Sequence, residues 1–225
     1  MTRSLDRLRQ AVEQSQDEYA QKLDQQWLAT VADQYRGHSV KEIIGGRGKN
    51  SKGEVVEYEA GWNDSLNDDD VDKLADYIED PTKFLILRGT AGTGKSTLAA
   101  TLGRKMVHDH QFSGAFVNSV SLISEFSYRE DYKNPVRHFS DFDLLVIDDL
   151  GAVTESLTAH QQKALWNLIE SRWSVRNKYT IITTNMAIQD NNEGLGLSSW
   201  IGESAWDRIA SDLTRVNMSG DSFRL

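Results

Sequence analysis

The feature that most constrains this chain of 225 residues is the stretch Gly89-Thr-Ala-Gly-Thr-Gly-Lys-Ser-Thr97, which matches the pattern G-x-x-x-x-G-K-[ST] in full. An apolar run, Phe84–Leu87, precedes it, and residues 96–110 have a helical pattern. Glycines let the backbone curl so that successive N–H groups point inward, and the start of a helix adds the positive end of its dipole. The sequence therefore predicts a strand, a phosphate-binding loop and a helix in succession.

Strand-like and helix-like segments alternate along the chain from residue 83. The strand-like segments are residues 83–89, 114–120, 142–149 and 178–185, and the helix-like segments are residues 96–110, 121–131 and 157–176. Such alternation is typical of a parallel sheet with helices on both faces. We therefore predict an α/β fold whose phosphate-binding loop joins a sheet strand to a flanking helix.

Two carboxylates follow the most apolar of these runs. Asp148 and Asp149 come directly after Leu144–Ile147, and ligands of α/β proteins bind at the carboxyl ends of strands. We expect Asp148 and the Ser96 hydroxyl to bind Mg²⁺, and Asp149 to orient or deprotonate an attacking water. Lys95 would contact the β and γ phosphates of a nucleotide. These residues together predict a site for a magnesium-bound nucleoside triphosphate.

A polar triplet, Thr183-Thr184-Asn185, ends the last of these strand-like runs. The Asn185 amide can hydrogen-bond the attacking water or the γ phosphate. Asparagine is equally suited to the turn that follows a strand. From the residues alone, both interpretations stay open.

Charge and composition narrow the class of protein. The net charge is -9, and residues 1–80 hold 10 Lys+Arg against 18 Asp+Glu, whereas residues 81–225 hold 15 against 16. Because an acidic chain is a poor non-specific binder of nucleic acid, any DNA contact needs a local basic patch. The acidic N-terminal part suits a protein partner. No apolar run is long enough to span a membrane, and the absence of cysteine suits a reducing cytoplasm.

The N-terminal part predicts one long helix over residues 4–36, with Ser4 as its N-cap and Gly37 as its stop. Apolar residues recur at helical spacings, at Leu5, Leu8, Val12, Tyr19, Leu23 and Trp27. This helix either packs on its own domain or serves as an arm for a partner protein.

The region that follows is interpreted as a linker or mobile hairpin over residues 45–70. Its basic stretch, Arg47–Lys52, is either a solvated loop or a phosphate contact. A helix then begins at the Asp68–Asp70 group and ends before Pro81. We expect a helical, partner-binding segment with its linker at residues 1–69 and a phosphate-binding domain at residues 70–225.

These motifs resemble those of AAA+ ATPases, and more narrowly those of the DnaC/IstB-like group, which contains bacterial and phage helicase loaders and the ATPase helpers of some transposases. The resemblance is carried by residues 89–97, 144–151, 180–185 and 206–225, and it covers about residues 70–225. It implies a P-loop NTPase fold of AAA+ type without a full C-terminal helical lid. It also implies ATP and Mg²⁺ as ligands, slow and partner-stimulated ATP hydrolysis, and the cytoplasm of a bacterium or of a phage-infected host.

The resemblance assigns further roles to residues. Asn185 becomes the sensor 1 residue, and Arg208 becomes the arginine finger that reaches the nucleotide of a neighbouring subunit. Some loaders carry another arginine where this chain has Ser204, so Arg215 is an alternative finger. Arg224 is a candidate second phosphate sensor. The nucleotide contacts implied are Gly89, Thr90, Ala91, Gly92, Thr93, Gly94, Lys95, Ser96, Thr97 and Arg224. The catalytic set implied is Lys95, Asp149, Asn185 and Arg208, and the metal ligands are Ser96 and Asp148.

A stretch that interleaves aromatic and basic residues lies before the Asp148 strand. Its candidate DNA contacts are Tyr128, Arg129, Tyr132, Lys133 and Arg137. This mixture suits single-stranded DNA, because bases stack on tyrosine and phosphates pair with arginine or lysine. An ordinary polar connection is the alternative. Self-association into a ring or spiral would repeat a weak patch and strengthen binding by multivalency.

Three functions are consistent with these features. The first is a helicase loader that grips a replicative helicase through residues 1–80, binds DNA and uses ATP to control assembly and release. The second is an IstB-like helper of a transposase that binds duplex DNA, although duplex wrapping favours a more basic chain. The third is a nucleotide-dependent adaptor switch with little turnover.

Overall fold

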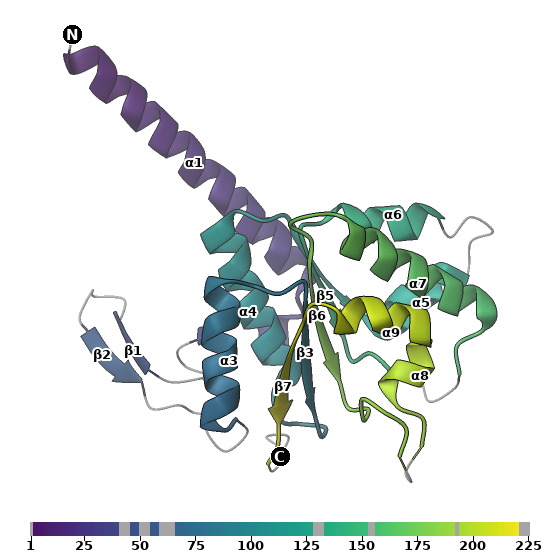
Figure 1. The fold of residues 1–225 in the computed structure, drawn as a ribbon. Coiled ribbons are helices and arrows are strands. Elements are labelled where there is room, and N and C mark those ends of the chain that lie inside the picture. Colours follow the sequence, from purple (N-terminus) through teal and green to yellow (C-terminus); the bar gives the residue numbers. More distant parts are fainter. Residues whose placement is uncertain are drawn as a thin grey trace.

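The computed structural model describes residues 2–40, 46–49, 55–58, 66–127, 133–152, 156–191 and 194–220 (Figure 1). Its centre is a sheet of five parallel strands in the order β4-β5-β6-β3-β7. The strands are β3 (Phe84–Gly89), β4 (Gly114–Asn118), β5 (Leu144–Asp148), β6 (Tyr179–Thr184) and β7 (Leu213–Met218). The predicted α/β class is confirmed. The edge strand β7 was not expected, because only Val216 and Met218 of its six residues are buried.

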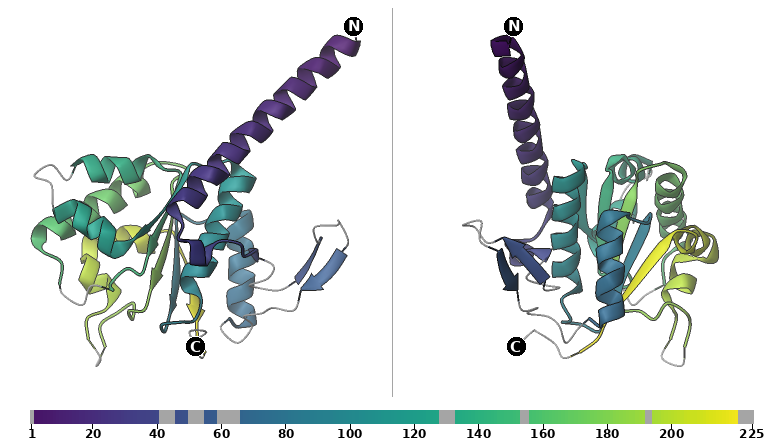
Figure 2. Two further views of the ribbon diagram at one scale, coloured as in Figure 1. Left: turned by 180° about the vertical axis from the view of Figure 1, so that it is seen from behind. Right: turned by 60° about the vertical axis from the view of Figure 1, so that its left-hand side comes forward.

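Helices cover both faces of this sheet, because side chains alternate along each strand (Figure 2). Leu85 and Leu87 pack with α1, α3 and α4, whereas Phe84 and Ile86 pack with α5, α7, α8 and α9. These helices are α1 (Thr2–Thr30), α3 (Asp68–Glu79), α4 (Lys95–His110), α5 (Ser119–Ser127), α6 (Lys133–Asp141), α7 (Ala159–Ser174), α8 (Leu197–Ile201) and α9 (Glu203–Ala210). None of the helices in the described part of the chain is long and apolar enough to cross a membrane.

The long N-terminal helix α1 divides into two halves. Its C-terminal half packs on the sheet domain, where Leu23, Trp27 and the following Val31 are buried. Trp27 lies against α4 and β4 so closely that a Cβ added at Gly103 would lie 2.4 Å from its ring. The N-terminal half projects away from the rest of the molecule (Figures 1 and 2). Packing on the chain's own domain is therefore confirmed for one half of the helix only.

The expected bounds of this helix were wrong at both ends. Ser4 lies inside α1, which begins at Thr2, and α1 ends at Thr30 instead of residue 36. A short 3-10 helix, Asp33–Tyr35, follows. After α1 the backbone becomes extended at Ala32 (φ −62°, ψ 144°), and the Thr30 hydroxyl donates to the Trp27 carbonyl (2.8 Å) and accepts from the Phe116 N–H (3.0 Å). The chain is thereby tied to β4 before the helical pattern of the sequence runs out.

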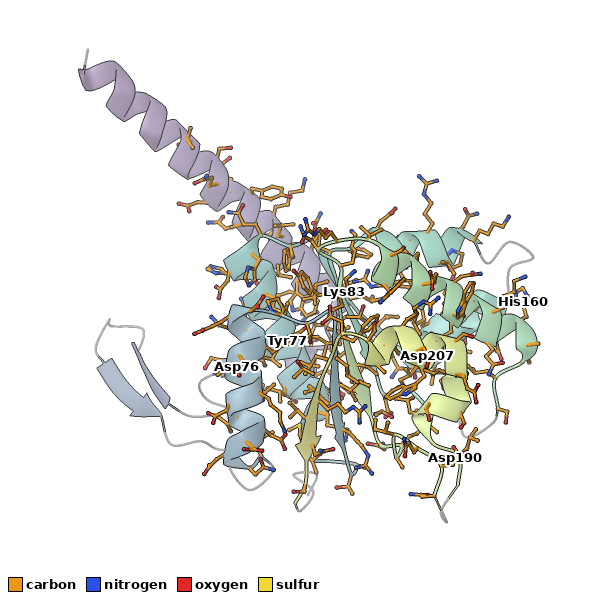
Figure 3. The ribbon with its side chains drawn as sticks, viewed as in Figure 1. Asp76, Tyr77, Lys83, His160, Asp190 and Asp207 are labelled. Carbon is orange, nitrogen blue, oxygen red and sulfur yellow. The ribbon has the colours of Figure 1, made fainter. Side chains whose placement is uncertain are left out.

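The segment between α1 and the sheet contains a hairpin and a helix. Strands β1 (Gly46–Lys49) and β2 (Val55–Tyr58) pair antiparallel, in agreement with the hairpin interpretation. Helix α3 begins at Asp68 and ends before Pro81, as expected, and its N-cap is Asn67, whose side chain accepts from the Asp70 N–H. Tyr77 points from α3 toward the sheet and is buried, whereas its neighbour Asp76 is exposed (Figure 3).

A buried arginine joins the helices of the second face to the sheet. Arg172 of α7 is 1% exposed, and burial lowers its pKa to about 9, so the guanidinium stays charged at neutral pH. It donates hydrogen bonds to the Phe139, Phe142, Asp143 and Tyr179 carbonyls and to the Thr180 hydroxyl. One side chain therefore supplies hydrogen-bond donors to acceptors at the end of α6 and at the starts of β5 and β6.

Candidate nucleotide-binding site

The carboxyl ends of four neighbouring strands bring the candidate residues to one edge of the sheet. Strands β4, β5, β6 and β3 are adjacent and parallel. Ser119 follows β4, Asp149 follows β5, Asn185 follows β6 and the loop after Gly89 follows β3. In Figure 1 this edge lies at the lower end of the sheet. The order of the strands thus joins motifs that are far apart in the sequence.

The phosphate-binding loop has the backbone that its glycines were expected to provide. Gly92 and Gly94 have φ values of 87° and 86°, which side-chain-bearing residues rarely adopt. Helix α4 begins at Lys95, directly after Gly94. Gly89 has a different reason to be glycine, because an added Cβ would lie 1.9 Å from the Met218 carbonyl oxygen of β7. The first glycine of the motif therefore serves the packing of the sheet.

The ammonium group of Lys95 lies within the loop. Lys95 is 6% exposed, and its Nζ donates to the Thr90 carbonyl at 2.6 Å and lies 3.5 Å from the Thr93 hydroxyl. The Thr93 hydroxyl also donates to the Thr90 carbonyl, at 3.0 Å. These contacts concentrate a positive charge inside a curl of backbone N–H groups, which is an arrangement that binds phosphate.

Asp148 is buried beside the start of α4. It is 4% exposed, and burial raises the pKa of its carboxyl above the usual value of 3.8. Hydrogen bonds from the Thr183 and Ser96 hydroxyls oppose that rise, the charge of Asp149 adds to it, and the charge of Lys95 opposes it. The bond from Thr183 Oγ1 to Asp148 Oδ1 measures 2.6 Å. The structure therefore brings Ser96 and Asp148 together, as the sequence predicts for a metal site.

The chemistry of these two side chains fits magnesium. A hydroxyl and a carboxylate are hard oxygen ligands, and Mg²⁺ is usually held by one or two protein groups together with phosphates and waters. Among the described residues, no group of three or more His, Cys, Asp or Glu side chains could hold a metal by itself. A magnesium ion held by Ser96 and Asp148 would complete its coordination with nucleotide phosphates and waters.

Asp149 and Asn185 also lie together. Asn185 Nδ2 donates to Asp149 Oδ1 at 3.4 Å, and Asn185 is exposed. Asp149 has a φ of 57°, so the backbone leaves the extended path of β5 at this residue. An amide and a carboxylate at this distance can together hold one water molecule.

The candidate arginines lie elsewhere. Arg208 lies in the last turn of α9, near the end of the sheet at which β7 begins. Its Nε donates to Glu170 Oε2 at 2.7 Å, and its guanidinium lies 4.8 Å from the centre of the Trp173 ring. Arg215 lies on β7, 5.4 Å from the Trp206 ring. The phosphate-binding loop lies at the opposite end of the sheet from Arg208, and Arg215 pairs with Ile86, midway along β3. The finger role of either arginine stays a prediction that requires a second subunit. Arg224 lies outside the described residues.

The candidate DNA contacts are only partly described. Lys133 and Arg137 are both exposed and lie one turn apart on α6. Helix α6 runs into the start of β5, so these side chains lie toward the edge opposite the phosphate-binding loop. Tyr128, Arg129 and Tyr132 lie outside the described residues.

Two residues of this edge were not predicted as part of the site. Thr183 and Ser119 are each 1% exposed, and their hydroxyls contact the Asp148–Asp149 segment. The signal for Thr183 was present in the polar triplet that ends β6. Ser119 has no such signal, because nothing in the sequence shows that β4 adjoins β5.

This fold and this edge define a P-loop NTPase of AAA+ type: a parallel sheet flanked by helices, with a glycine-rich loop, a lysine and paired aspartates at the carboxyl ends of the strands. The chain belongs to the IstB-like ATP-binding protein family, a family of P-loop ATPases, whose model matches residues 7–225. The family match therefore includes most of the N-terminal segment, beyond the residues that carry the resemblance in the sequence motifs.

The chain is similar to proteins of two kinds. It is 29% identical over 143 residues to the insertion-sequence ATP-binding protein y4pL of Sinorhizobium fredii, covering 62% of this chain and 56% of that protein. It is also 29% identical over 143 residues to the replicative helicase loader DnaC of Buchnera aphidicola subsp. Acyrthosiphon pisum, covering 61% and 54%. The chain thus spans about half the length of the curated relatives it matches.

Solved structures share the fold. The crystal structure of the DnaC helicase loader superposes with a TM-score of 0.59 at 20% identity, covering 83% of this chain and all of that chain. The crystal structure of DnaI gives 0.57 at 19% identity, covering 74% and 88%. At these identities the likeness concerns the fold alone.

Proposed function

We propose that this chain binds Mg²⁺-ATP at the edge formed by β3, β5 and β6 and hydrolyses it. The observation that carries this proposal is the convergence of Lys95, Ser96, Asp148 and Asp149 from separate motifs. The loop N–H groups and Lys95 bind the β and γ phosphates, and Ser96 and Asp148 hold the metal. The metal, when bound, neutralises charge on the phosphate oxygens.

Asp149 and Asn185 would act on the attacking water. The Asp149 carboxylate accepts a proton from the water or orients it, and the Asn185 amide fixes the water from the other side. An arginine of a neighbouring subunit, Arg208 or Arg215, would add charge at the γ phosphate. Hydrolysis therefore depends on self-association, which explains why it would be slow in an isolated chain.

Single-residue variants test the reaction. Lys95→Ala should lose binding of a fluorescent ATP analogue. Asp149→Asn should bind it normally yet lower kcat by about 100-fold or more, as expected on removal of a general base. Asp141→Asn is the matched control, since Asp141 is exposed on α6 away from the site. Unchanged hydrolysis by Asp149→Asn would remove Asp149 from the mechanism.

We further propose that the protein is a helicase loader that binds a replicative helicase through an exposed face of α1. Val12 and Tyr19 are 50% and 51% exposed, seven residues apart on one face of α1, and exposed apolar side chains at helical spacing are typical of helix-mediated contacts. The similarity to a DnaC loader supports the same interpretation. Such a loader would also contact single-stranded DNA through the stretch that contains Lys133 and Arg137.

A binding assay with a purified replicative helicase tests this role. Val12→Asp and Tyr19→Ala should each weaken capture at least about 10-fold, as is common for central contacts. Glu18→Gln, an exposed change on the same helix, should not. ATP hydrolysis should be unchanged in all three. Wild-type capture by both apolar variants would refute the assignment of this face.

A helper of a transposase is the second candidate function, favoured by the family model and by the similarity to an insertion-sequence ATP-binding protein. It predicts tight, salt-sensitive binding of duplex DNA without contact to a helicase. A third candidate, an adaptor switch, predicts ATP binding without turnover even when DNA is present.

A further inference from the structure

Two buried hydroxyls hold the segment that carries the paired aspartates. Thr183 Oγ1 accepts from the Asp149 N–H at 2.7 Å and donates to Asp148 Oδ1 at 2.6 Å. Ser119 Oγ donates to the Asp149 carbonyl at 2.6 Å. The two hydroxyls, called here the hydroxyl pair, come from β6 and from the first residue of α5, directly after β4. These strands lie on either side of β5, so the segment is held from both sides.

The backbone of Asp149 explains why such contacts are needed. Its φ of 57° lies in the left-handed region, where residues with side chains are uncommon. Such a conformation persists only where the surroundings determine it strongly. The Leu150 N–H also donates to the Thr183 carbonyl at 2.8 Å. The peptide groups before and after Asp149 are thus each fixed by a hydrogen bond to a neighbouring strand.

We propose that Thr183 and Ser119 are positioning residues for ATP hydrolysis: the hydroxyl pair sets the carboxylate of Asp148 toward the metal and holds Asp149 in the left-handed turn that directs its carboxylate to the water. This inference rests on the proposed ATPase function. Neither hydroxyl needs to contact the nucleotide, because each acts through an aspartate.

The two residues should act on different steps. Thr183 contacts both aspartates, so its hydroxyl supports metal binding and the placement of Asp149. Ser119 contacts only the Asp149 carbonyl, so its hydroxyl supports turnover alone. Groups that orient a metal ligand typically change metal affinity or activity by about 10–100-fold when they are removed.

The experiment compares variants of the full chain that remove or keep one hydroxyl. Mg²⁺ should raise the affinity of the wild-type chain for an ATP analogue. In Thr183→Val we expect this Mg²⁺-dependent gain in affinity to be smaller by about 10-fold or more, and kcat to be lower by about 10–100-fold. Binding of the analogue without Mg²⁺ should stay within about twofold of wild type, because the phosphate-binding loop is untouched. Thr183→Ser, which keeps a hydroxyl, should recover most of both losses. Ser119→Ala should lower kcat about 10-fold and leave the Mg²⁺-dependent affinity unchanged.

Thr180→Val is the matched structural control. Thr180 is also buried on β6, but its hydroxyl accepts from Arg172 Nε at 2.9 Å and lies at the other end of the strand. This variant should lower the melting temperature and leave kcat and the Mg²⁺ response near wild type. Ser119→Ala provides an independent test should Thr183→Val fail to fold.

The outcomes distinguish a failure of the positioning role from a failure of the proposed ATPase function. A wild-type response to Mg²⁺ and a wild-type kcat in Thr183→Val would overturn the inference while Asp149→Asn still stops turnover. Equal losses in Thr180→Val and Thr183→Val, or no recovery in Thr183→Ser, would overturn it as well. A wild-type chain that binds no Mg²⁺-ATP would overturn the proposed function itself.

Discussion

Replacing Trp27 with alanine tests whether the N-terminal helix is an integral part of the ATPase domain. Trp27 is 1% exposed, contacts α4 and β4, and stacks edge-on to Phe116 with ring centroids 6.3 Å apart. A buried tryptophan removes about 200 Å² from water, worth roughly 5 kcal/mol at about 25 cal/mol per Å². That figure is an upper bound, so we expect Trp27→Ala to lower the free energy of unfolding by about 3–5 kcal/mol.

Urea denaturation followed by far-UV circular dichroism measures this loss. Val12→Ala, on the exposed half of the same helix, is the control and should change stability by less than about 0.5 kcal/mol. Gly103→Ala should cost about 1–3 kcal/mol alone, because its new methyl meets the Trp27 ring. That cost should largely disappear in the Trp27→Ala background. A loss below about 1 kcal/mol for Trp27→Ala would refute the assignment of α1 to the domain core.

Three further predictions concern the sheet and its edge. Because burial raises the pKa of Asp148, its charge destabilises the nucleotide-free protein above that pKa. Asp148→Asn should therefore have a higher melting temperature than wild type at pH 7. Differential scanning calorimetry should show this difference disappearing as the pH falls to 3.8, where the wild-type carboxyl is protonated. Arg172→Met should lower stability by about 3 kcal/mol or more in urea titrations, since five acceptors lose their donor, and a neutral result would contradict the proposed joining of α6, β5 and β6. Gly89→Ala should fold poorly or melt markedly lower, because the Met218 carbonyl occupies the space of the new Cβ; normal melting with weakened ATP binding would instead assign Gly89 to the nucleotide alone.

Much of the site could be predicted because most of its residues belong to short motifs that can be recognised in the sequence. The loop from Gly89 to Thr97 has a fixed spacing, and the run before Asp148 is apolar enough to be recognised as a buried strand. The structure adds the residues whose place in the site depends on the order of the strands. Thr183 and Ser119 belong to the site only because β6 and β4 flank β5, which no local pattern records.

The predicted end of α1 was wrong and strand β7 was not predicted, because both depend on contacts between distant parts of the chain. The periodicity of residues 4–36 favours a continuous helix, yet α1 ends at Thr30, whose hydroxyl accepts from the Phe116 N–H of a distant strand. Strand β7 was missed because alternating burial of Val216 and Met218 is too short a signal beside polar neighbours. Tertiary contacts override weak local preferences at both places.

Helix α1 packs on α4 at one end and projects from the domain at the other (Figure 1). Helix α4 starts at the phosphate-binding loop, and its Arg104 makes two hydrogen bonds, of 2.7 and 2.8 Å, to Asp24 of α1, next to the Trp27 contact. The outer half of α1, from Asp17 to Thr2, extends about 22 Å at 1.5 Å per residue. A swing of about 10° at the pivot would carry its tip about 4 Å. A small rotation of α1 on α4 would therefore move the N-terminal tip of α1 by several ångströms.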